Sequence, residues 1–294
     1  MRRPILYLLL PLFLIYSCKK DHSAITPPAQ KMYRVSFDAS GFTQRIGTGS
    51  VKGKQVNSLQ TNDTGTEYDV DAFSYVVYNN QNDGLIHQIL QKAGTPGWGT
   101  VIDSLPAGNY NVYFMAYNSS YVSVDVNNRN MYVSSGFAPW PDTYFKKLGS
   151  FTVSDQAISQ PVSLERIVGQ VTFKLLDTLP PNPGWAAVSV SADYYMYNFD
   201  SGPTGTLKPT GSFSTTITSR TNVTASTFVM NTAPVSATIS CYTATGAGIG
   251  QVSVPNVSVV PNRQTILTGY LLGTNAGVSP TLGQAWGPPV SGGF

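Results

Sequence analysis

Apolar and polar residues alternate with a period of two along most of this 294-residue chain. In Tyr33–Phe37, Phe73–Val77 and Val188–Met196, every second side chain is apolar. Successive side chains of a strand point to opposite faces, so this period predicts β-strands, whereas a helix would repeat its apolar residues every three or four positions. No long amphipathic helical pattern interrupts the alternation. We therefore expect an all-β fold of about 14 strands.

Clusters of Gly, Pro, Asn and Asp separate the expected strands. Asn79–Gly84, Pro106–Asn109 and Pro180–Gly184 supply the positive or fixed φ angles that tight turns need. Many short strands spaced by such turns favour β-sandwiches over a parallel sheet with crossover helices. One strand differs: Tyr110–Ala116 is apolar at nearly every position, so we expect it to be covered on both faces.

The length suits two domains of ordinary size once an export signal is removed. The best boundary lies near residues 162–168, just before the strong strand at Gly169–Leu176. The last 20 residues are rich in Gly and Pro and read as an extended tail. The expected organisation is a signal peptide at 1–17, a flexible tether at 18–31, an N-terminal sandwich at 32–165, a C-terminal sandwich at 166–274 and a tail at 275–294.

The N-terminus has the features of an export signal. Arg2 and Arg3 precede the apolar run Ile5–Ile15, which is too short to span a bilayer as a helix. Ile15–Cys18 resembles a bacterial lipobox, in which the cysteine receives a diacylglyceryl group and becomes the first mature residue. The resemblance implies palmitate or a similar acyl chain on Cys18, an outer-membrane anchor and exposure at the cell surface. An ordinary secretory signal with an incidental cysteine is the alternative.

Charge and cysteine content exclude several classes of protein. Loss of residues 1–17 removes Arg2 and Arg3, which leaves 16 basic against 15 acidic residues. No Lys/Arg cluster remains, so we expect no nucleic-acid partner. After lipidation of Cys18, Cys241 is the single remaining thiol and cannot form an internal disulfide. It shares the apolar face of Val235–Cys241, so we interpret it as a small buried residue.

Five segments carry a resemblance to a known family: Ser17–Asp21, Tyr33–Phe37, Leu105–Val112, Leu164–Phe173 and Val259–Leu272. Together they resemble the fimbrillin-type subunits and anchors of Bacteroidetes type V pili. The resemblance implies two transthyretin-like β-sandwich domains, lipoprotein export, a role in cell adhesion, and other fimbrial subunits as partners. It also implies assembly by strand addition, in which an open sheet edge accepts an extended segment whose alternate side chains fill a groove.

The resemblance also makes the first strand a candidate functional element, with Tyr33, Val35 and Phe37 as strand-exchange residues. In structural subunits of that family, a trypsin-like protease removes the first strand after an arginine. Cleavage after Arg45 would remove Tyr33–Phe37 here and open a groove. If the strand is retained, the protein would instead act as a lipid-held anchor or minor subunit. The sequence leaves both roles open.

The sequence contains no motif for catalysis. It has two histidines, His22 and His87, and no nucleophile elbow, phosphate loop or dinucleotide fingerprint. Zinc needs several His or Cys ligands, so we expect no metal, no cofactor and no enzymatic activity. A surface glycan-binding lipoprotein is the alternative function, because aromatic side chains near turns can stack on sugar rings. Its candidate residues are Trp98, Trp140 and Trp185.

Overall fold

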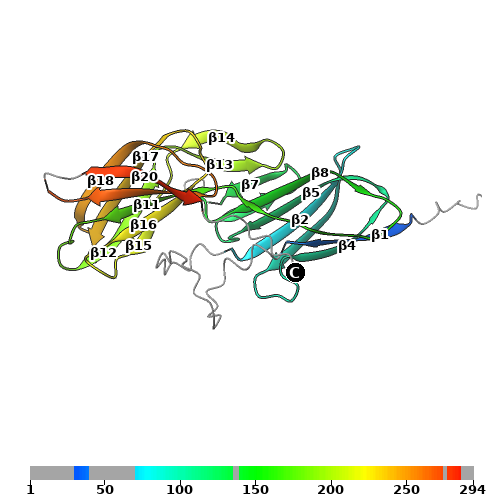
Figure 1. Cartoon of the computed structure of the whole chain (residues 1–294), viewed down its shortest axis with the longest axis horizontal. Helices are drawn as coiled ribbons and strands as arrows, with labels where there is room; N and C mark the ends of the chain where they lie inside the picture. The colour runs from blue at the N-terminus through cyan, green and yellow to red at the C-terminus, as the bar shows by residue number, and fades with distance from the viewer. Residues whose placement is uncertain (1–29, 40–69, 135–138, 274–276, 286–294) are drawn as a thin grey trace, which may run out of the picture. The chain divides into compact units, whose positions relative to one another are not determined.

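The computed structural model describes residues 30–39, 70–134, 139–273 and 277–285. Residues 1–31 and 32–294 form two separate units, and the second contains all the strands. The described residues hold twenty β-strands and no helix (Figure 1). The predicted all-β class is therefore confirmed. No helix in these ranges is long and apolar enough to cross a membrane.

Two sheets enclose the first core. One is three-stranded, with order β4-β1-β9, and the other is five-stranded, with order β10-β8-β5-β2-β3. Their facing side chains form one apolar cluster, to which β1, β2 and β5 contribute Phe37, Phe73 and Phe114. The strands are β1 (Met32–Asp38), β2 (Ala72–Asn79), β3 (Leu85–Lys92), β4 (Thr100–Pro106), β5 (Gly108–Tyr117), β8 (Tyr144–Val153), β9 (Ile158–Pro161) and β10 (Glu165–Arg166).

The five-stranded sheet is buried on its second face as well. Tyr78 of β2 and Tyr113 and Met115 of β5 belong to a separate cluster that includes Trp140 and Phe199. β5 is consequently buried at six consecutive positions, as expected from its apolar sequence. A four-stranded sheet of order β14-β13-β7-β6 supplies part of this cover. Its strands are β6 (Val122–Asp125), β7 (Asn130–Val133), β13 (Asp193–Asn198) and β14 (Gly202–Lys208).

Two further four-stranded sheets enclose the third core. Their orders are β16-β11-β19-β20 and β15-β12-β17-β18, and their shared cluster includes Phe173, Ile239, Cys241 and Leu267. Cys241 is fully buried, as predicted. The strands are β11 (Gly169–Leu175), β12 (Pro183–Val190), β15 (Phe213–Thr216), β16 (Thr224–Val229), β17 (Val235–Thr243), β18 (Gly248–Val257), β19 (Arg263–Tyr270) and β20 (Gly277–Ala285).

The alternation at Val188–Met196 does not form the single strand that its sequence suggests. The chain bends at Ser191, so β12 and β13 join different sheets. Apolar residues stay at every second position on both sides of the bend, so the period of the sequence does not show that the strand ends there. β13 then pairs with β7, through Met196–Asn198 and Asn130–Tyr132. Strands from both sides of the predicted boundary at residue 165 therefore share one sheet, and the division into two domains stays a prediction.

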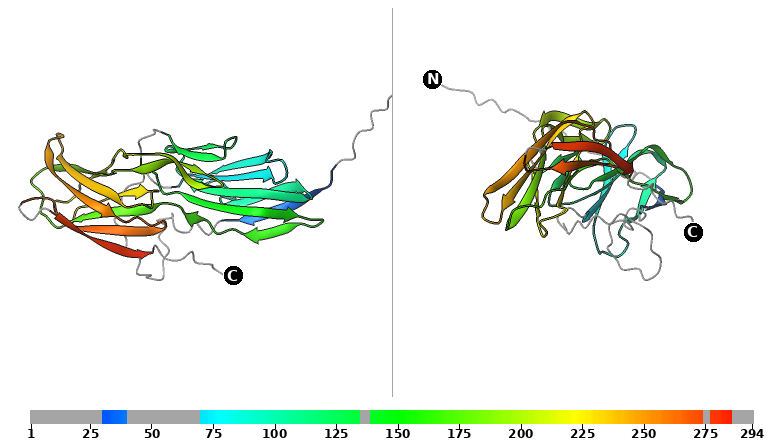
Figure 2. Two further views of the ribbon diagram at one scale, coloured as in Figure 1. Left: turned by 90° about the horizontal axis from the view of Figure 1, so that it is seen from above. Right: turned by 60° about the vertical axis from the view of Figure 1, so that its left-hand side comes forward.

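Part of the segment expected to be an extended tail forms a strand. β20 pairs antiparallel with β19, from Tyr270↔Gly277 to Arg263↔Ala285. Figure 2 shows β20 in red beside β19. Gly and Pro composition predicts an extended chain in this segment but gives no sign of a sheet partner.

Candidate functional site

The first strand occupies the centre of its sheet. β1 pairs antiparallel with β4 along its whole length, from Met32↔Pro106 to Asp38↔Thr100. On its other side it pairs parallel with β9, from Val35↔Ile158 to Asp38↔Pro161. β4 and β9 are joined only through β1 in the three-stranded sheet. Removal of β1 would leave two facing edges of unpaired backbone, which is the geometry that accepts an added strand.

The alternate side chains of β1 fill the core beneath it. Val35 and Phe37 are completely buried, and Tyr33 is half-buried against the same cluster. The Phe37 ring lies 5.1 Å from the Phe114 ring centroid and 5.2 Å from that of Phe151. These contacts come from β5 and β8, so β1 covers part of one face of the five-stranded sheet. The three predicted strand-exchange residues thus lie on one face, directed into one core.

Two of the residues predicted from the sequence fall outside the described ranges. Cys18, the predicted lipidation site, belongs to residues 1–29, and Arg45, the predicted processing site, belongs to residues 40–69. Both stay predictions. β1 lies between these two segments.

The three tryptophans singled out for stacking have different environments. Trp140 is completely buried, and its Nε1 donates a hydrogen bond to the Tyr194 carbonyl oxygen, so its ring cannot meet a ligand in this structure. Trp98 packs edge-on against Phe73 at the margin of the first core. Trp185 is half-exposed and stacks on Tyr242, with ring centroids 5.2 Å apart. Large aromatic residues near turns often pack in the core, and their position in the sequence does not distinguish core packing from stacking on a ligand.

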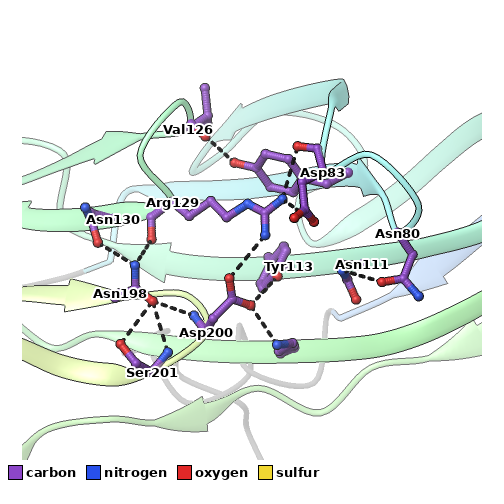
Figure 3. A network of polar contacts seen from close by, with 12 residues as sticks. Asn80, Asp83, Asn111, Tyr113, Val126, Arg129, Asn130, Asn198, Asp200 and Ser201 are labelled. Carbon is purple, nitrogen blue, oxygen red and sulfur yellow. Dashed lines mark hydrogen bonds and ion pairs between the residues drawn. The ribbon is translucent and has the colours of Figure 1, made fainter.

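A polar network centred on Asp200 connects the β13–β14 turn to the five-stranded sheet. Its carboxylate accepts hydrogen bonds from Tyr113 Oη at 2.6 Å, Lys147 Nζ at 2.7 Å and Arg129 Nη1 at 3.2 Å. Figure 3 shows Asp200 facing Tyr113 and Arg129. Burial by itself would raise the pKa of the Asp200 carboxyl, but the hydrogen bonds from Lys147, Tyr113 and Arg129 lower it.

Arg129 carries the network to the β2–β3 turn. Its Nη2 donates to Asp83 Oδ1 at 2.9 Å and to the Asp83 carbonyl oxygen at 3.1 Å. The guanidinium also lies 4.3 Å from the centroid of the Tyr78 ring. Turns from three parts of the chain are thereby held together. Sequence reasoning missed this network because its members are single residues in separate turns, with no shared spacing.

Asp193, at the start of β13, is a buried carboxylate. Its Oδ1 accepts backbone hydrogen bonds from Met230 at 3.0 Å, Asn231 at 2.7 Å and Tyr194 at 2.9 Å. Burial raises the pKa of the Asp193 carboxyl to about 7, although these donors oppose the shift. This clamp fixes the β16–β17 connection against β13 and is a structural arrangement.

The candidate residues do not assemble into a catalytic or metal centre. His87 Nδ1 lies 2.8 Å from Asp103 Oδ1, and Asp103 also accepts a hydrogen bond from Tyr75 at 3.2 Å. His87 is exposed on β3. Across the ranges that the structure describes, no three His, Cys, Asp or Glu side chains are placed to hold a metal ion.

Comparison with solved structures supports the fold. A candidate polysaccharide-binding protein from Bacteroides thetaiotaomicron matches 85% of this chain and 95% of its own, with a TM-score of 0.52 and 9% identity. The match with the fimbrial anchor protein Mfa2 from Porphyromonas gingivalis covers 87% of this chain and 100% of that protein, with a TM-score of 0.44 and 14% identity. The match with the tip fimbrial protein Mfa3 from the same species covers 87% of this chain and 100% of that protein, with a TM-score of 0.45 and 12% identity.

The match with a TM-score of 0.52 supports the all-β fold. Fimbrial proteins and adhesins of Bacteroidetes are also among the solved structures that resemble this chain. At such low identity the similarity concerns the fold. No family model and no curated protein matches the chain.

Proposed function

We propose that the protein is a lipid-anchored structural component of a bacterial cell-surface fimbrium, either its anchor or a subunit, and that it assembles by strand addition. The observation that carries the proposal is the position of β1. It is the central strand of a three-stranded sheet, and the inward side chains Val35 and Phe37 fill the core below. A strand of the same pattern from a neighbouring subunit would pair with β4 and β9 in the same way.

The remaining parts of the proposal come from the sequence. The lipobox-like segment ending at Cys18 supports a diacylglyceryl anchor in the outer membrane, with the body of the protein at the cell surface. Arg45 would be the cleavage site if the protein is a polymerising subunit. Retention of β1 would make it a terminal anchor. The resemblance to fimbrillin-type proteins supports other fimbrial subunits as partners.

Release and replacement of β1 would test strand addition. The full chain is treated with an arginine-specific protease and then offered a labelled synthetic peptide of residues 31–39. We expect the cleaved protein to capture the peptide. A peptide with Val35→Asp should fail because it buries a charge, whereas one with Ser36→Asp should still bind because Ser36 lies on the other face. Equal capture of the two variant peptides, or no capture of the natural one, would overturn the proposal.

The anchor has its own test. Cys18→Ser removes the thiol that would be acylated, so we expect loss of labelled palmitate and release of the protein from the membrane fraction. Unchanged partition with the envelope would refute lipidation at this residue. An Arg45→Gln variant then separates the two roles: detergent-resistant polymers that disappear with this change indicate a subunit, and their absence in both forms indicates an anchor.

Two of the three tryptophans named for the alternative of a surface glycan-binding lipoprotein do not suit that role. Trp140 belongs to the core, and Trp98 packs at a core margin. Trp185 is the member of the set that keeps a half-exposed ring beside another aromatic side chain.

A further inference from the structure

One sheet of the molecule has no charged residue in any of its strands. In β12, β15, β17 and β18 there is no Asp, Glu, Lys, Arg or His. Each of the other four sheets has at least one charged residue among its described strands, for example Arg34, Lys146, Lys174 and Lys208. The chain is low in charge, but this sheet is uncharged throughout.

The outer face of this sheet presents hydroxyl, amide and aromatic groups. In β17, buried Val235, Ala237 and Ile239 alternate with half-exposed residues, so the second set faces away from the core. The cross-strand register places residues of the other three strands beside them. The outer face consists of Trp185, Ser189, Ser214, Thr216, Ser236, Thr238, Ser240, Tyr242, Gln251 and Ser253, with the buried Ala187 between them.

The aromatic pair stands at one end of this face. Trp185 and Tyr242 are direct cross-strand partners, and their rings are stacked at an interplanar angle of 21°. On the other side, the partner of Tyr242 in β18 is Gly248, and a side chain added at Gly248 would meet no atom within 4 Å. The β18 position paired with Tyr242 therefore carries no side chain and is open.

We propose that the outer face of sheet β15-β12-β17-β18, here called the neutral face, binds an uncharged polysaccharide. A pyranose ring has an apolar C–H side that lies against an aromatic ring, and hydroxyls that exchange hydrogen bonds with Ser, Thr and Gln side chains. Gly248 places no side chain in the path of a sugar ring that approaches Tyr242, and the rows of hydroxyls extend the contact across the strands. A neutral polymer is the partner that matches a surface without charge, because an acidic polymer would need Lys or Arg to offset its desolvation.

This site differs from the strand-exchange site and does not depend on it. The neutral face belongs to the third core, whereas β1 closes the first. If strand addition fails its test, polysaccharide binding is unaffected. If polysaccharide binding fails its test, strand addition is unaffected. The assigned residues are Trp185 and Tyr242 as the stacking pair, with Thr238, Ser240 and Gln251 as polar contacts.

Affinity gel electrophoresis of the full chain tests the proposal. Native gels are cast with a neutral β-glucan, a neutral α-mannan or, as the charged probe, polygalacturonate. We expect at least one neutral polymer to retard the protein and polygalacturonate to leave it unretarded. Trp185→Ala should weaken the retardation about tenfold, which corresponds to about 1.4 kcal/mol. Trp185→Phe should recover part of the loss.

Two further variants separate binding from folding. Ser240→Asp places a charge on the neutral face without altering the core, and it should abolish retardation while the thermal transition stays unchanged. Tyr270→Ala removes an exposed tyrosine from the neighbouring sheet and should bind normally. Retardation by polygalacturonate alone, no retardation by any polymer, or equal retardation of wild type and Ser240→Asp would overturn the proposal. Self-association that Ser240→Asp abolishes would assign the face to a second copy instead.

Discussion

The five-stranded sheet and the sheet β15-β12-β17-β18, which carries the neutral face, differ in how many of their faces are buried. In β5 of the first, six consecutive residues are buried, because one face packs on β1 and its neighbours and the other on the layer that contains β7 and β13. In β17 of the second, buried and half-exposed residues alternate from Val235 to Tyr242. A sheet covered on both sides can only hold the fold together, whereas a sheet with one open face can also meet a partner.

The largest difference should appear when the same charge is placed in each sheet. Met115→Asp puts a carboxylate among the fully buried residues of β5, and Ser240→Asp puts one on the open face of β17. We expect the first variant to be largely unfolded, at a cost above about 4 kcal/mol, and the second to stay within about 0.5 kcal/mol of wild type. Urea denaturation followed by tryptophan fluorescence measures both. Similar midpoints would mean that the second face of the five-stranded sheet is not covered.

Removal of a large aromatic ring from the five-stranded sheet should give the second largest loss of stability. Phe114→Ala leaves a cavity below β1, where the ring contacts Phe37, Phe73 and Tyr75. We expect a loss of about 3–5 kcal/mol of unfolding free energy. Tyr270→Ala, which removes a 44% exposed ring, is the matched control and should cost much less. Equal losses would contradict the assignment of Phe114 to a closed core.

The layer that covers the second face should respond to pH through Asp193. Its carboxyl has a pKa near 3.8 when unfolded and about 7 when folded, so the folded state holds the proton more tightly. The stability from this group is fully present below about pH 4 and is lost as the pH rises through 7. Thermal unfolding between pH 5 and 8 should show a falling Tm that flattens in Asp193→Asn. Asp155→Asn, at an exposed position, should keep the wild-type slope.

Asp200 should have a smaller effect with the opposite pH direction. Asp200→Asn removes the charge that accepts from Lys147, Tyr113 and Arg129, and the side chain is 38% exposed, so solvent screens part of the loss. We expect a cost of about 1–2 kcal/mol at neutral pH. Because the pKa of the Asp200 carboxyl is lowered on folding, its contribution disappears as the pH falls into the acidic range. Chemical denaturation at pH 7 and pH 3 should show a smaller variant penalty at pH 3 than at pH 7.

The sequence predicted the strands well and their partners poorly. The period of two identifies β1, β2 and β17, and the nearly continuous apolar run at Tyr110–Ala116 correctly indicated a strand covered on both faces. Alternation records which side of a strand is buried, but it does not record the sheet to which the strand belongs. The parity of Val188–Met196 therefore passed unbroken through the bend that separates β12 from β13.

The candidate sites show the same limit. Val35 and Phe37 were predicted as inward strand residues because their neighbours in the chain define the pattern. Trp140 and Trp185 look alike in the sequence, since each lies near a proline, yet one is a buried core residue and the other pairs with Tyr242 across two strands. The Asp200 network joins residues from separate turns, and only the packed fold brings them together.

The pairing of β7 with β13 sets an order of events during synthesis of the chain. Synthesis runs from the N-terminus, so Asn130–Val133 is complete well before Asp193–Asn198. Until then, β7 can pair only with β6, and the face of β5 that carries Tyr113 and Met115 lacks the part of its cover that β13 provides. The second face of the five-stranded sheet therefore gains this part of its cover only after about two-thirds of the chain has been synthesised, and its apolar side chains are exposed during that interval.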